Sequence, residues 1–267
     1  DQMVWEDVDL PNPIDNQVLV KHEFVGFNMV DTYHRSGIYP SPPKPCRLGT
    51  EGAGVVVEVG SKVTDFSVGD RVAYAGSGSG LGSYSYSRLM NANDLIKVPD
   101  WMGLEIAAAI LTKGRTVEYL FNRTHKLQKG DSILFNAAAG GVGQIAGQWA
   151  NSLGAFAIGI VGSKDKEEFA LKSGYKNVFN MQDHDIVNEV MAITDGKGVD
   201  VVYDSIGKTT WDISLASVRK LGLVVSFGRA SGNPPLYDVA KDGVKNSAYI
   251  HRATMVNYMT SPEIARK

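Results

Sequence analysis

Two parts of the chain differ in their pattern of apolar and polar positions. From about residue 104 onward, continuous apolar runs alternate with amphipathic segments, which is typical of parallel strands covered by helices on both faces. Ser132 begins an apolar strand that runs into a small-residue turn and then a helix. Further strands are expected at 155–161, 177–180, 198–204, 223–228 and 247–255, with helices at 166–173, 185–194 and 210–220. This alternation predicts a parallel, doubly wound α/β sheet.

The first hundred residues are different, with short β-rich runs at 17–21, 54–60 and 70–74 separated by Pro and Gly turns such as 39–45. They predict a small β-barrel-like domain ahead of the parallel sheet. A helix that starts at Leu104 is expected to link the two. We therefore predict one domain over residues 1–112 and a second over 113–267.

The turn after the strand at Ser132 carries the spacing Ala138-x-Gly140-x-x-Gly143. This is the Rossmann dinucleotide fingerprint with Ala in place of the first Gly. Small residues let a pyrophosphate approach the backbone, and the following helix offers unpaired N–H groups and the positive end of its dipole. A glycine-rich turn alone is weak evidence, because it also suits any tight strand-to-helix connection. The surrounding α/β pattern favours the dinucleotide site.

The next strand ends at Gly162, where an NAD site usually has an acidic residue that binds the ribose hydroxyls. Ser163, Lys164 and Lys166 follow instead, and this charge balance favours the 2′-phosphate of NADPH over NAD. Asp165 lies among the lysines, so the segment is also compatible with the solvated first turn of a helix.

Ligands of doubly wound sheets gather beyond the carboxyl ends of the strands. Three strand ends, 204–207, 227–229 and 252–254, are therefore expected near the cofactor. The cofactor-binding residues predicted there are Ser205, Phe227, Gly228, Arg229, Ala253 and Thr254. For Asp204 and Arg229, a strand-end turn or a surface charge is an equally good interpretation.

Composition narrows the function classes. A net charge of −2 gives no general attraction to nucleic acid or to an anionic membrane. A single cysteine, Cys46, indicates a reducing compartment and makes the cytoplasm the default location. The five histidines show no ligand-like spacing, and no cysteine cluster for a structural zinc is present in the sequence.

Motifs over nearly the whole chain carry a family resemblance. They are Asn28–Pro40, Leu48–Gly54, Val68–Val72, Ala137–Gly143, Asp204–Gly207 and Ser226–Gly228. The chain resembles quinone oxidoreductases of the zeta-crystallin type, a zinc-free branch of the medium-chain dehydrogenase/reductase superfamily. The resemblance implies a Rossmann NADPH-binding domain plus a GroES-like barrel substrate domain, no metal, a quinone substrate and a homodimer. Asn28 and Thr50 stand where zinc-dependent relatives have a Cys and a His ligand.

The resemblance also implies particular site residues. The residues expected around the nicotinamide, in a cleft between the domains, are Asn28, Asp31, Tyr33, Tyr39, Lys113, Thr116 and Tyr119. The pyrophosphate is expected at Gly140, Gly141, Val142 and Gly143, and the adenosine end at Gly162, Ser163, Lys166 and Met181. Lys166 aligns with the family's phosphate-binding lysine, whereas Met181 replaces a Tyr found in a relative.

Asn28 and Tyr39 are the candidate catalytic residues, as donors to the oxygen of a reduced carbonyl, where negative charge develops. Each also has a structural interpretation: Asn28 as a turn cap and Tyr39 as a loop anchor. No strong acid/base pair stands out, which suits a reaction whose proton comes from water.

Two other functions stay open. One is an NADPH-dependent alkenal or enone reductase, and the other a non-catalytic NADPH- or RNA-binding crystallin-like protein. The resemblance further implies additional residues beyond Lys267 that complete the substrate domain, so we expect a longer chain. The strand at 247–258 is expected at or next to the edge of the sheet, where two subunits can pair.

Overall fold

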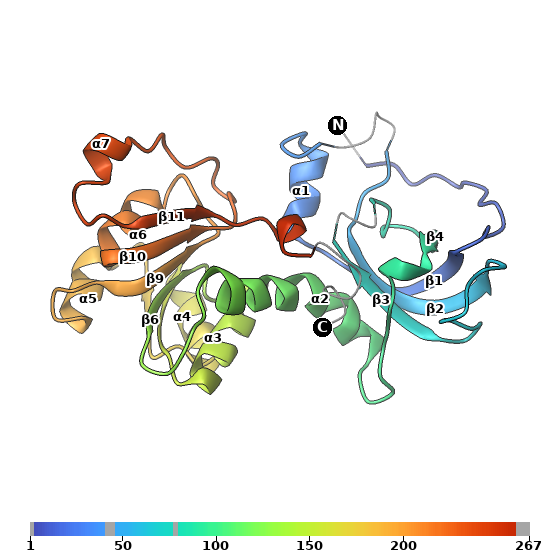
Figure 1. Cartoon of the computed structure of the whole chain (residues 1–267), viewed down its shortest axis with the longest axis horizontal. Helices are drawn as coiled ribbons and strands as arrows, with labels where there is room; N and C mark the ends of the chain where they lie inside the picture. Colours follow the sequence, from blue (N-terminus) through green and yellow to red (C-terminus); the bar gives the residue numbers. More distant parts are fainter. Residues whose placement is uncertain (1–2, 41–45, 77–79, 260–267) are drawn as a thin grey trace. The chain divides into compact units, whose positions relative to one another are not determined.

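The computed structural model describes residues 3–40, 46–76 and 80–259, so the part of the predicted turn at 41–45 lies outside the described residues (Figure 1). Two compact units make up the described chain. The first comprises the residues up to Thr112 together with Met259, and the second runs from Lys113 to Tyr258. Each unit has its own sheet.

The first unit is built on an antiparallel five-stranded sheet in the order β4-β1-β2-β3-β5. Its strands are β1 (Gln17–Gly26), β2 (Glu51–Val59), β3 (Arg71–Ala75), β4 (Ser87–Asn91) and β5 (Ile96–Lys97). The short helix α1 (Met29–Arg35) follows β1, and the turn η2 (Ala92–Asp94) follows β4. Alternation along β1 buries Val18 and Val20 in one core. On the sheet's other face, Ala53 and Ala73 pack against the first half of α2 (Leu104–Tyr119).

The second unit contains a parallel six-stranded sheet in the order β11-β10-β9-β6-β7-β8. Its strands are β6 (Ser132–Asn136), β7 (Phe156–Val161), β8 (Asn177–Asn180), β9 (Val199–Asp204), β10 (Val218–Ser226) and β11 (Tyr249–Arg252). The chain moves outward from β6 to β8, then returns to β9 on the other side of β6. This reversal is the topological switch of the Rossmann order. The predicted fold class, a doubly wound parallel sheet beside a β-rich GroES-like domain, is confirmed.

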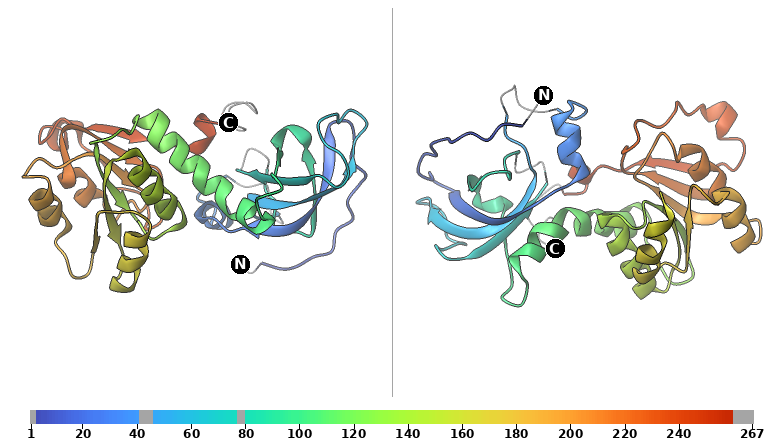
Figure 2. Two further views of the ribbon diagram at one scale, coloured as in Figure 1. Left: turned by 90° about the horizontal axis from the view of Figure 1, so that it is seen from below. Right: turned by 180° about the vertical axis from the view of Figure 1, so that it is seen from behind.

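Helices cover both faces of the parallel sheet (Figure 2). One face packs against the second half of α2, α3 (Gly141–Leu153) and α4 (Glu167–Lys172). The other face packs against α5 (Ile186–Ile193) and α6 (Trp211–Ser217). The remaining helical segments are η3 (Leu120–Thr124), η4 (Lys164–Lys166), α7 (Val239–Asp242) and η5 (Met255–Asn257). Because these strands are buried on both faces, their sequences are continuously apolar.

Two predicted elements differ in extent. The helix expected at 210–220 ends at Ser217, because the next residue, Val218, is buried and pairs with Val199 in the sheet. Strand β10 therefore begins five residues before the predicted Leu223 and passes an irregularity at Leu221, whose φ is +57°. Tertiary pairing has outweighed the local helical pattern here.

The final strand is shorter than the predicted 247–255. Strand β11 covers Tyr249–Arg252, and the chain then leaves the ladder through the turn η5. As predicted, this strand lies at the sheet edge. Of the apolar residues assigned to the edge, Tyr249 and Ile250 are in β11, whereas Met255 and Val256 belong to the turn.

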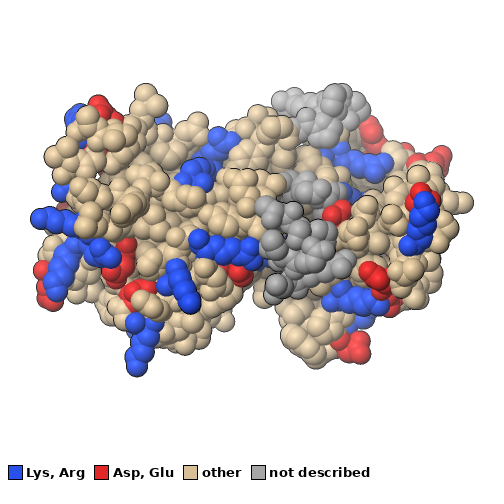
Figure 3. All heavy atoms as spheres, viewed as in Figure 1, with Lys and Arg blue, Asp and Glu red and all other residues tan. Residues whose placement is uncertain are grey.

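Basic and acidic side chains are interspersed on the face shown in Figure 3, in keeping with the small net charge. Among the residues that the structure describes, no helix is both long enough and apolar enough to span a membrane.

Candidate functional site

The fingerprint turn joins β6 to α3 at the switch point of the sheet. Gly140 caps α3 in an extended conformation, and it has no side chain that could bond to the N–H groups of the first turn. The first N–H groups of a helix have no intrahelical acceptor. A Cβ atom on Gly143 would clash with the carbonyl oxygens of Ala137 and Ala138. The turn thus has the open, N–H-rich form that suits a pyrophosphate.

Hydrogen bonds from neighbouring residues hold the backbone of the turn. Ala137 takes a left-handed conformation, φ +59°, and its carbonyl accepts from Gly140 N at 2.9 Å. Tyr175, which is buried, donates its hydroxyl to the carbonyl of Gly143 at 2.8 Å. Burial raises the pKa of Tyr175 far above its ordinary value, so this hydroxyl stays a donor. The turn is therefore preorganised, because its backbone is held without a ligand.

Two of the predicted cofactor residues flank the turn. A Cβ on Gly141 would come within 2.8 Å of the Lys113 side chain, so that lysine extends over the start of α3. Val142 is half-buried and packs on the core between α3 and the sheet. The structure brings Lys113 to the predicted pyrophosphate segment.

The carboxyl end of β7 presents the predicted adenosine-binding residues. Gly162 is exposed, and nothing would lie within 4 Å of a Cβ there. Lys164 and Lys166 are exposed in η4. A hydrogen bond from Ser163 holds the pKa of Asp165 below its ordinary value, so this carboxylate already has a partner among the predicted binding residues. Met181 is hydrogen-bonded through its N–H to Val161 O and packs on the apolar core.

The ends of β9 and β10 meet on the other side of the switch point. The N–H of Phe227 donates to Asp204 O at 2.8 Å, and a Cβ on Gly228 would clash with the backbone of Ser205. Phe227 packs against Phe135 of β6 with ring centroids 5.7 Å apart. This close approach of the two strand ends follows from their register.

The remaining predicted neighbours lie close by. The N–H of Ala253 donates to Ser226 O at 3.0 Å, which places Ala253 and Thr254 directly beyond β11. Arg229 donates to Asn233 Oδ1 at 3.0 Å. The parallel sheet therefore gathers the predicted residues of four successive strands, β6, β9, β10 and β11, along one edge.

Asp204 has a structural role that was one of two interpretations of the sequence. It is fully buried, and its carboxylate accepts from the N–H groups of Ile206 and Gly207 and from the hydroxyls of Thr210 and Ser214. These bonds hold the turn between β9 and α6.

On α2, Thr116 and Tyr119 are both buried. The Tyr119 ring stacks on Tyr258, with centroids 4.5 Å apart and planes 7° from parallel. Arg123 also donates to Tyr258 O at 2.9 Å. Tyr258 therefore holds the segment after β11 against the end of α2.

The candidate catalytic residues lie in the first unit around α1. Asn28, buried, is the residue that caps α1, and its N–H donates to Asp31 Oδ2 at 2.8 Å. Tyr33 is buried, and its ring meets Tyr39 edge-on at 5.3 Å. The N–H of Tyr39 donates to Tyr33 O at 3.0 Å. Both structural interpretations, the cap and the loop anchor, describe real contacts; neither bears on whether these residues also touch a ligand.

A buried polar network surrounds these residues. Asp31 accepts from the Thr50 hydroxyl and the Tyr84 hydroxyl, each at 2.9 Å. Burial, together with the nearby carboxylates of Asp31 and Glu51, raises the pKa of Tyr84 above its ordinary value. Among these residues, Tyr84 was not anticipated from the sequence, because its partner lies 53 residues away.

Asn28 and Thr50, which stand where zinc-dependent relatives have ligands, do not fit zinc. The Thr50 hydroxyl donates a hydrogen bond to Asp31, and the amide nitrogen of Asn28 donates one to Glu51 Oε2 at 2.7 Å. Zinc binds thiolate, imidazole or carboxylate ligands, usually three from the protein. Within the described ranges, no three His, Cys, Asp or Glu side chains are grouped to hold an ion.

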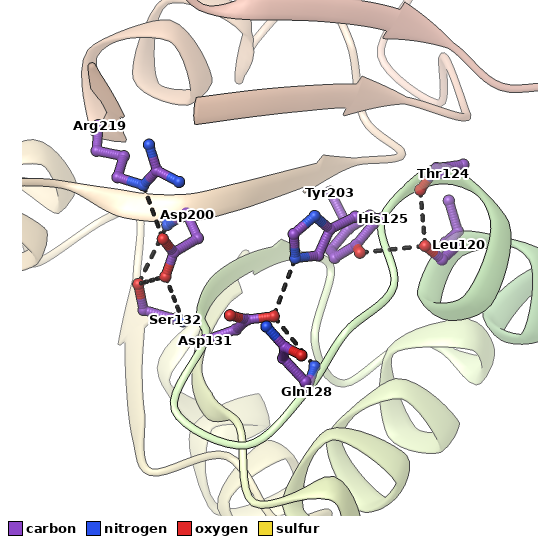
Figure 4. A network of polar contacts seen from close by, with 9 residues as sticks. All are labelled: Leu120, Thr124, His125, Gln128, Asp131, Ser132, Asp200, Tyr203 and Arg219. Carbon is purple, nitrogen blue, oxygen red and sulfur yellow. Dashed lines mark hydrogen bonds and ion pairs between the residues drawn. The ribbon is translucent and has the colours of Figure 1, made fainter. Parts of the chain in front are cut away.

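The opposite, amino-terminal edge of the parallel sheet carries a second polar network (Figure 4). Ser132 donates from its N–H and its hydroxyl to Asp200 Oδ2, both at 2.7 Å, and Arg219 Nε donates to Asp200 Oδ1 at 2.7 Å. Burial opposes ionisation of Asp200, yet the bonds from Ser132 and Arg219 keep its pKa below the ordinary value. A hollow of about 550 Å³ lies beside this network. It is on the edge away from the fingerprint turn and is separate from the predicted site. In its lining Asp200 binds Arg219, and Arg123 pairs with Glu118.

Two family models match the chain. An alcohol dehydrogenase GroES-like domain covers residues 14–100, and a zinc-binding dehydrogenase domain covers residues 141–265. The second model is named for zinc, although the residues at the ligand positions here do not fit that ion.

Known proteins match nearly the full length of this chain. A quinone oxidoreductase of Pseudomonas aeruginosa is 44% identical, with 97% of this chain and 79% of that protein covered. A 2-haloacrylate reductase of a Burkholderia species is also 44% identical, over 98% and 80% of the two chains. The crystal structure of Escherichia coli quinone oxidoreductase complexed with NADPH superimposes with a TM-score of 0.92 at 42% identity, over 97% and 79%. Together with the fingerprint turn and the two sheets, these matches identify the chain as an oxidoreductase that belongs to the quinone oxidoreductase family of the medium-chain dehydrogenase/reductases.

Proposed function

We propose that this protein uses NADPH to reduce quinones, without a metal. The observation that carries the proposal is the preorganised fingerprint turn, followed at the end of β7 by Ser163 and two lysines in place of an acidic residue. The NADPH complex of the Escherichia coli relative supports the same cofactor.

In this proposal the second unit binds the cofactor in three places. Backbone N–H groups of Gly141 to Gly143 bind the pyrophosphate, and Lys113 adds a positive charge beside them. Ser163 and Lys166 bind the 2′-phosphate, where a charge-assisted contact discriminates NADPH from NADH. The strand ends at Ser205, Phe227 to Arg229 and Ala253 to Thr254 line the remainder of the cofactor.

NADPH supplies a hydride, and a quinone that accepts this hydride and one proton becomes a hydroquinone. The protein's contribution is position and polarity. Asn28 and Tyr39 are the proposed polar contacts of the reacting groups, and Asp31 and Tyr33 support them from α1. Thr116 and Tyr119 are proposed to contact the cofactor from α2. Because no acid/base pair was recognised among these residues, water is the proposed proton source.

The test is steady-state oxidation of NADPH by the purified protein. We expect ortho-naphthoquinone and para-benzoquinone to be reduced with catalytic turnover and NADPH to be preferred over NADH. Turnover of 2-alkenals alone would replace the proposal by enone reduction. Tight NADPH binding without turnover of any acceptor would favour the non-catalytic binding protein.

Enone reduction is the second candidate, because the 2-haloacrylate reductase matches as well as the quinone oxidoreductases do. Both reactions use the same hydride geometry, but an enone accepts the hydride at its β-carbon. The two activities are therefore separated by the acceptor series and not by the cofactor.

A homodimer is also proposed, with two copies of β11 paired at the sheet edge. The strand is at the edge, and Tyr249 and Ile250 are 66% and 38% exposed. An open edge with few charges is a liability that two-fold pairing removes. A cytoplasmic location is proposed from the single cysteine.

A further inference from the structure

Tyr175 lies in the loop between α4 and β8, within the core that α3 forms with the sheet, and is 3% exposed. Its ring fits there because two neighbouring residues are glycine. A Cβ on Gly147 of α3 would come within 2.6 Å of the ring, and a Cβ on Gly159 of β7 within 3.2 Å. The ring therefore fills the space between helix and sheet, and its hydroxyl reaches Gly143 O at 2.8 Å.

A chain of hydrogen bonds leads from this contact to the amino end of α3. The accepting carbonyl of Gly143 shares a peptide group with Gln144, whose N–H donates to Gly140 O at 2.9 Å. The carbonyl of Gly140 shares a peptide group with the N–H of Gly141, the first residue of the helix. N–H groups at that position have no intrahelical acceptor. The chain thus runs in one direction, from the Tyr175 hydroxyl through two peptide groups to Gly141 N–H.

Such a chain strengthens the donor at its end. A hydrogen bond accepted by the carbonyl of a peptide group polarises the group, and its own N–H becomes a better donor, by about 10–30% per bond. The contact also ties the first turn of α3 to a residue outside the helix. Both effects favour an anion at Gly141 N–H, and by reciprocity a bound anion strengthens the contact of Tyr175.

We propose that Tyr175 is a positioning residue for the cofactor, which orients and polarises the N–H group of Gly141 that binds the pyrophosphate. This rests on the proposed function. Tyr175 acts through the backbone of α3 and makes no ligand contact of its own. Its effect is therefore specific to the pyrophosphate and does not extend to the adenosine end of the cofactor at β7.

Removing the hydroxyl alone tests the proposal. Tyr175→Phe keeps the ring that packs on Gly147 and Gly159. We expect it to raise the Kd for NADP⁺ about three- to tenfold, the range that one neutral hydrogen bond contributes. Adenosine 2′-monophosphate carries the 2′-phosphate but no pyrophosphate, so its Kd should change less than about twofold. Titration calorimetry with the purified protein gives both constants.

Tyr203→Phe is the matched control (Figure 4). Tyr203 is buried in the same core, and its hydroxyl also donates to a backbone carbonyl, Leu120 O at 3.2 Å, which is outside α3. Each variant should lower the melting temperature by about 2–4 °C. Only Tyr175→Phe should weaken the binding of NADP⁺.

Three results would overturn the proposal. The first is an unchanged Kd for NADP⁺ in Tyr175→Phe. The second is an equal loss of affinity in Tyr203→Phe, which would mean that the loss of any buried tyrosine hydroxyl weakens binding. The third is an equal loss for NADP⁺ and adenosine 2′-monophosphate, which would make Tyr175 a purely structural residue.

The hydrogen-bond chain can also be observed by NMR without a cofactor. In protein with isotope-labelled glycine, the Gly141 amide is assigned by its loss in Gly141→Ala, whose Cβ would meet the flexible side chain of Lys113. We expect Tyr175→Phe to move the Gly141 amide proton upfield and to leave Gly162, in an exposed turn outside the chain, in place.

An unmoved Gly141 resonance would refute the positioning role even if the affinity for NADP⁺ fell. If instead the unmodified protein binds no NADP⁺, the proposed function fails. The Gly141 resonance then still decides whether Tyr175 acts on the first turn of α3.

Discussion

Replacing Asp204 by alanine would measure how far the turn between β9 and α6 depends on one buried carboxylate. Asp204 Oδ1 accepts from Ile206 N at 2.8 Å and from Gly207 N at 3.0 Å. The hydroxyls of Thr210 and Ser214 donate to Oδ2 at 2.9 and 2.8 Å. Alanine leaves two backbone N–H groups without their acceptor, whereas the hydroxyls can turn to other acceptors.

The magnitude follows from the two N–H groups. An unsatisfied buried donor costs about 1–3 kcal/mol, so Asp204→Ala should lower the free energy of unfolding by about 2–6 kcal/mol. Asp204→Asn should cost only about 1 kcal/mol, since an amide oxygen can accept from both N–H groups and the amide NH2 can donate to both hydroxyls. The large difference between the two variants is the specific expectation.

Urea unfolding followed by tryptophan fluorescence is the assay. Trp211, 5% exposed at the start of α6, lies on this turn and reports its loss. Asp212→Ala, an exposed acid in the same turn, is the control and should stay within about 0.5 kcal/mol of the starting protein. If Asp204→Ala unfolds within about 1 kcal/mol of the starting protein, or if Asp204→Asn is equally damaging, hydrogen bonding by this carboxylate does not hold the turn.

Four further predictions concern the cofactor, pH, metal and assembly. Lys166→Ala should raise KM for NADPH about tenfold or more with little change for NADH, as expected for a lost charge-assisted bond, and Lys172→Ala on α4 is the control; equal effects on both cofactors would contradict it. The pKa of Asp200 is lowered in the folded state, so its stabilising contribution is present above the ordinary Asp pKa of about 3.9 and is lost as pH falls through and below that value; Asp200→Asn should therefore flatten the acid limb of a melting-temperature profile, and an unchanged limb would refute this. Incubation with a chelator should leave activity unchanged, because Asn28 and Thr50 donate to carboxylates, and stoichiometric zinc by elemental analysis together with lost activity would overturn that expectation. Sedimentation equilibrium should give a dimer mass that Ile250→Lys reduces toward the monomer, whereas a monomer mass for the unmodified protein would exclude pairing through β11.

The parallel sheet was predictable because its information is local. A strand, a small-residue turn and a helix follow one another at Ser132, and each apolar run further along predicts a strand by itself. The order of the strands then follows from the rules for right-handed crossovers. Local pattern failed at Val218, where a partner in β9 decided between helix and strand.

The candidate site was predictable only in part. Gly140, Gly143 and the lysines after β7 announce themselves by spacing and charge. The pair of Glu51 with Thr112 joins residues 61 positions apart, and Tyr84 reaches Asp31 across 53. No periodicity encodes such contacts, since they arise when strands and helices pack. For the same reason the sequence does not predict that the Asn28 amide donates to Glu51, 23 positions away.

The alanine at the first fingerprint position has a counterpart one strand away. A Cβ on Gly159 of β7 would come within 2.7 Å of the Ala138 methyl group and 3.2 Å of the Tyr175 ring, which itself bonds to Gly143. One methyl group therefore fits beneath the turn where two would not. The space beneath the turn can therefore hold a side chain at position 138 or at position 159, but not at both. During evolution, alanine at one of these positions requires glycine at the other. This restriction comes from packing alone and does not depend on a ligand.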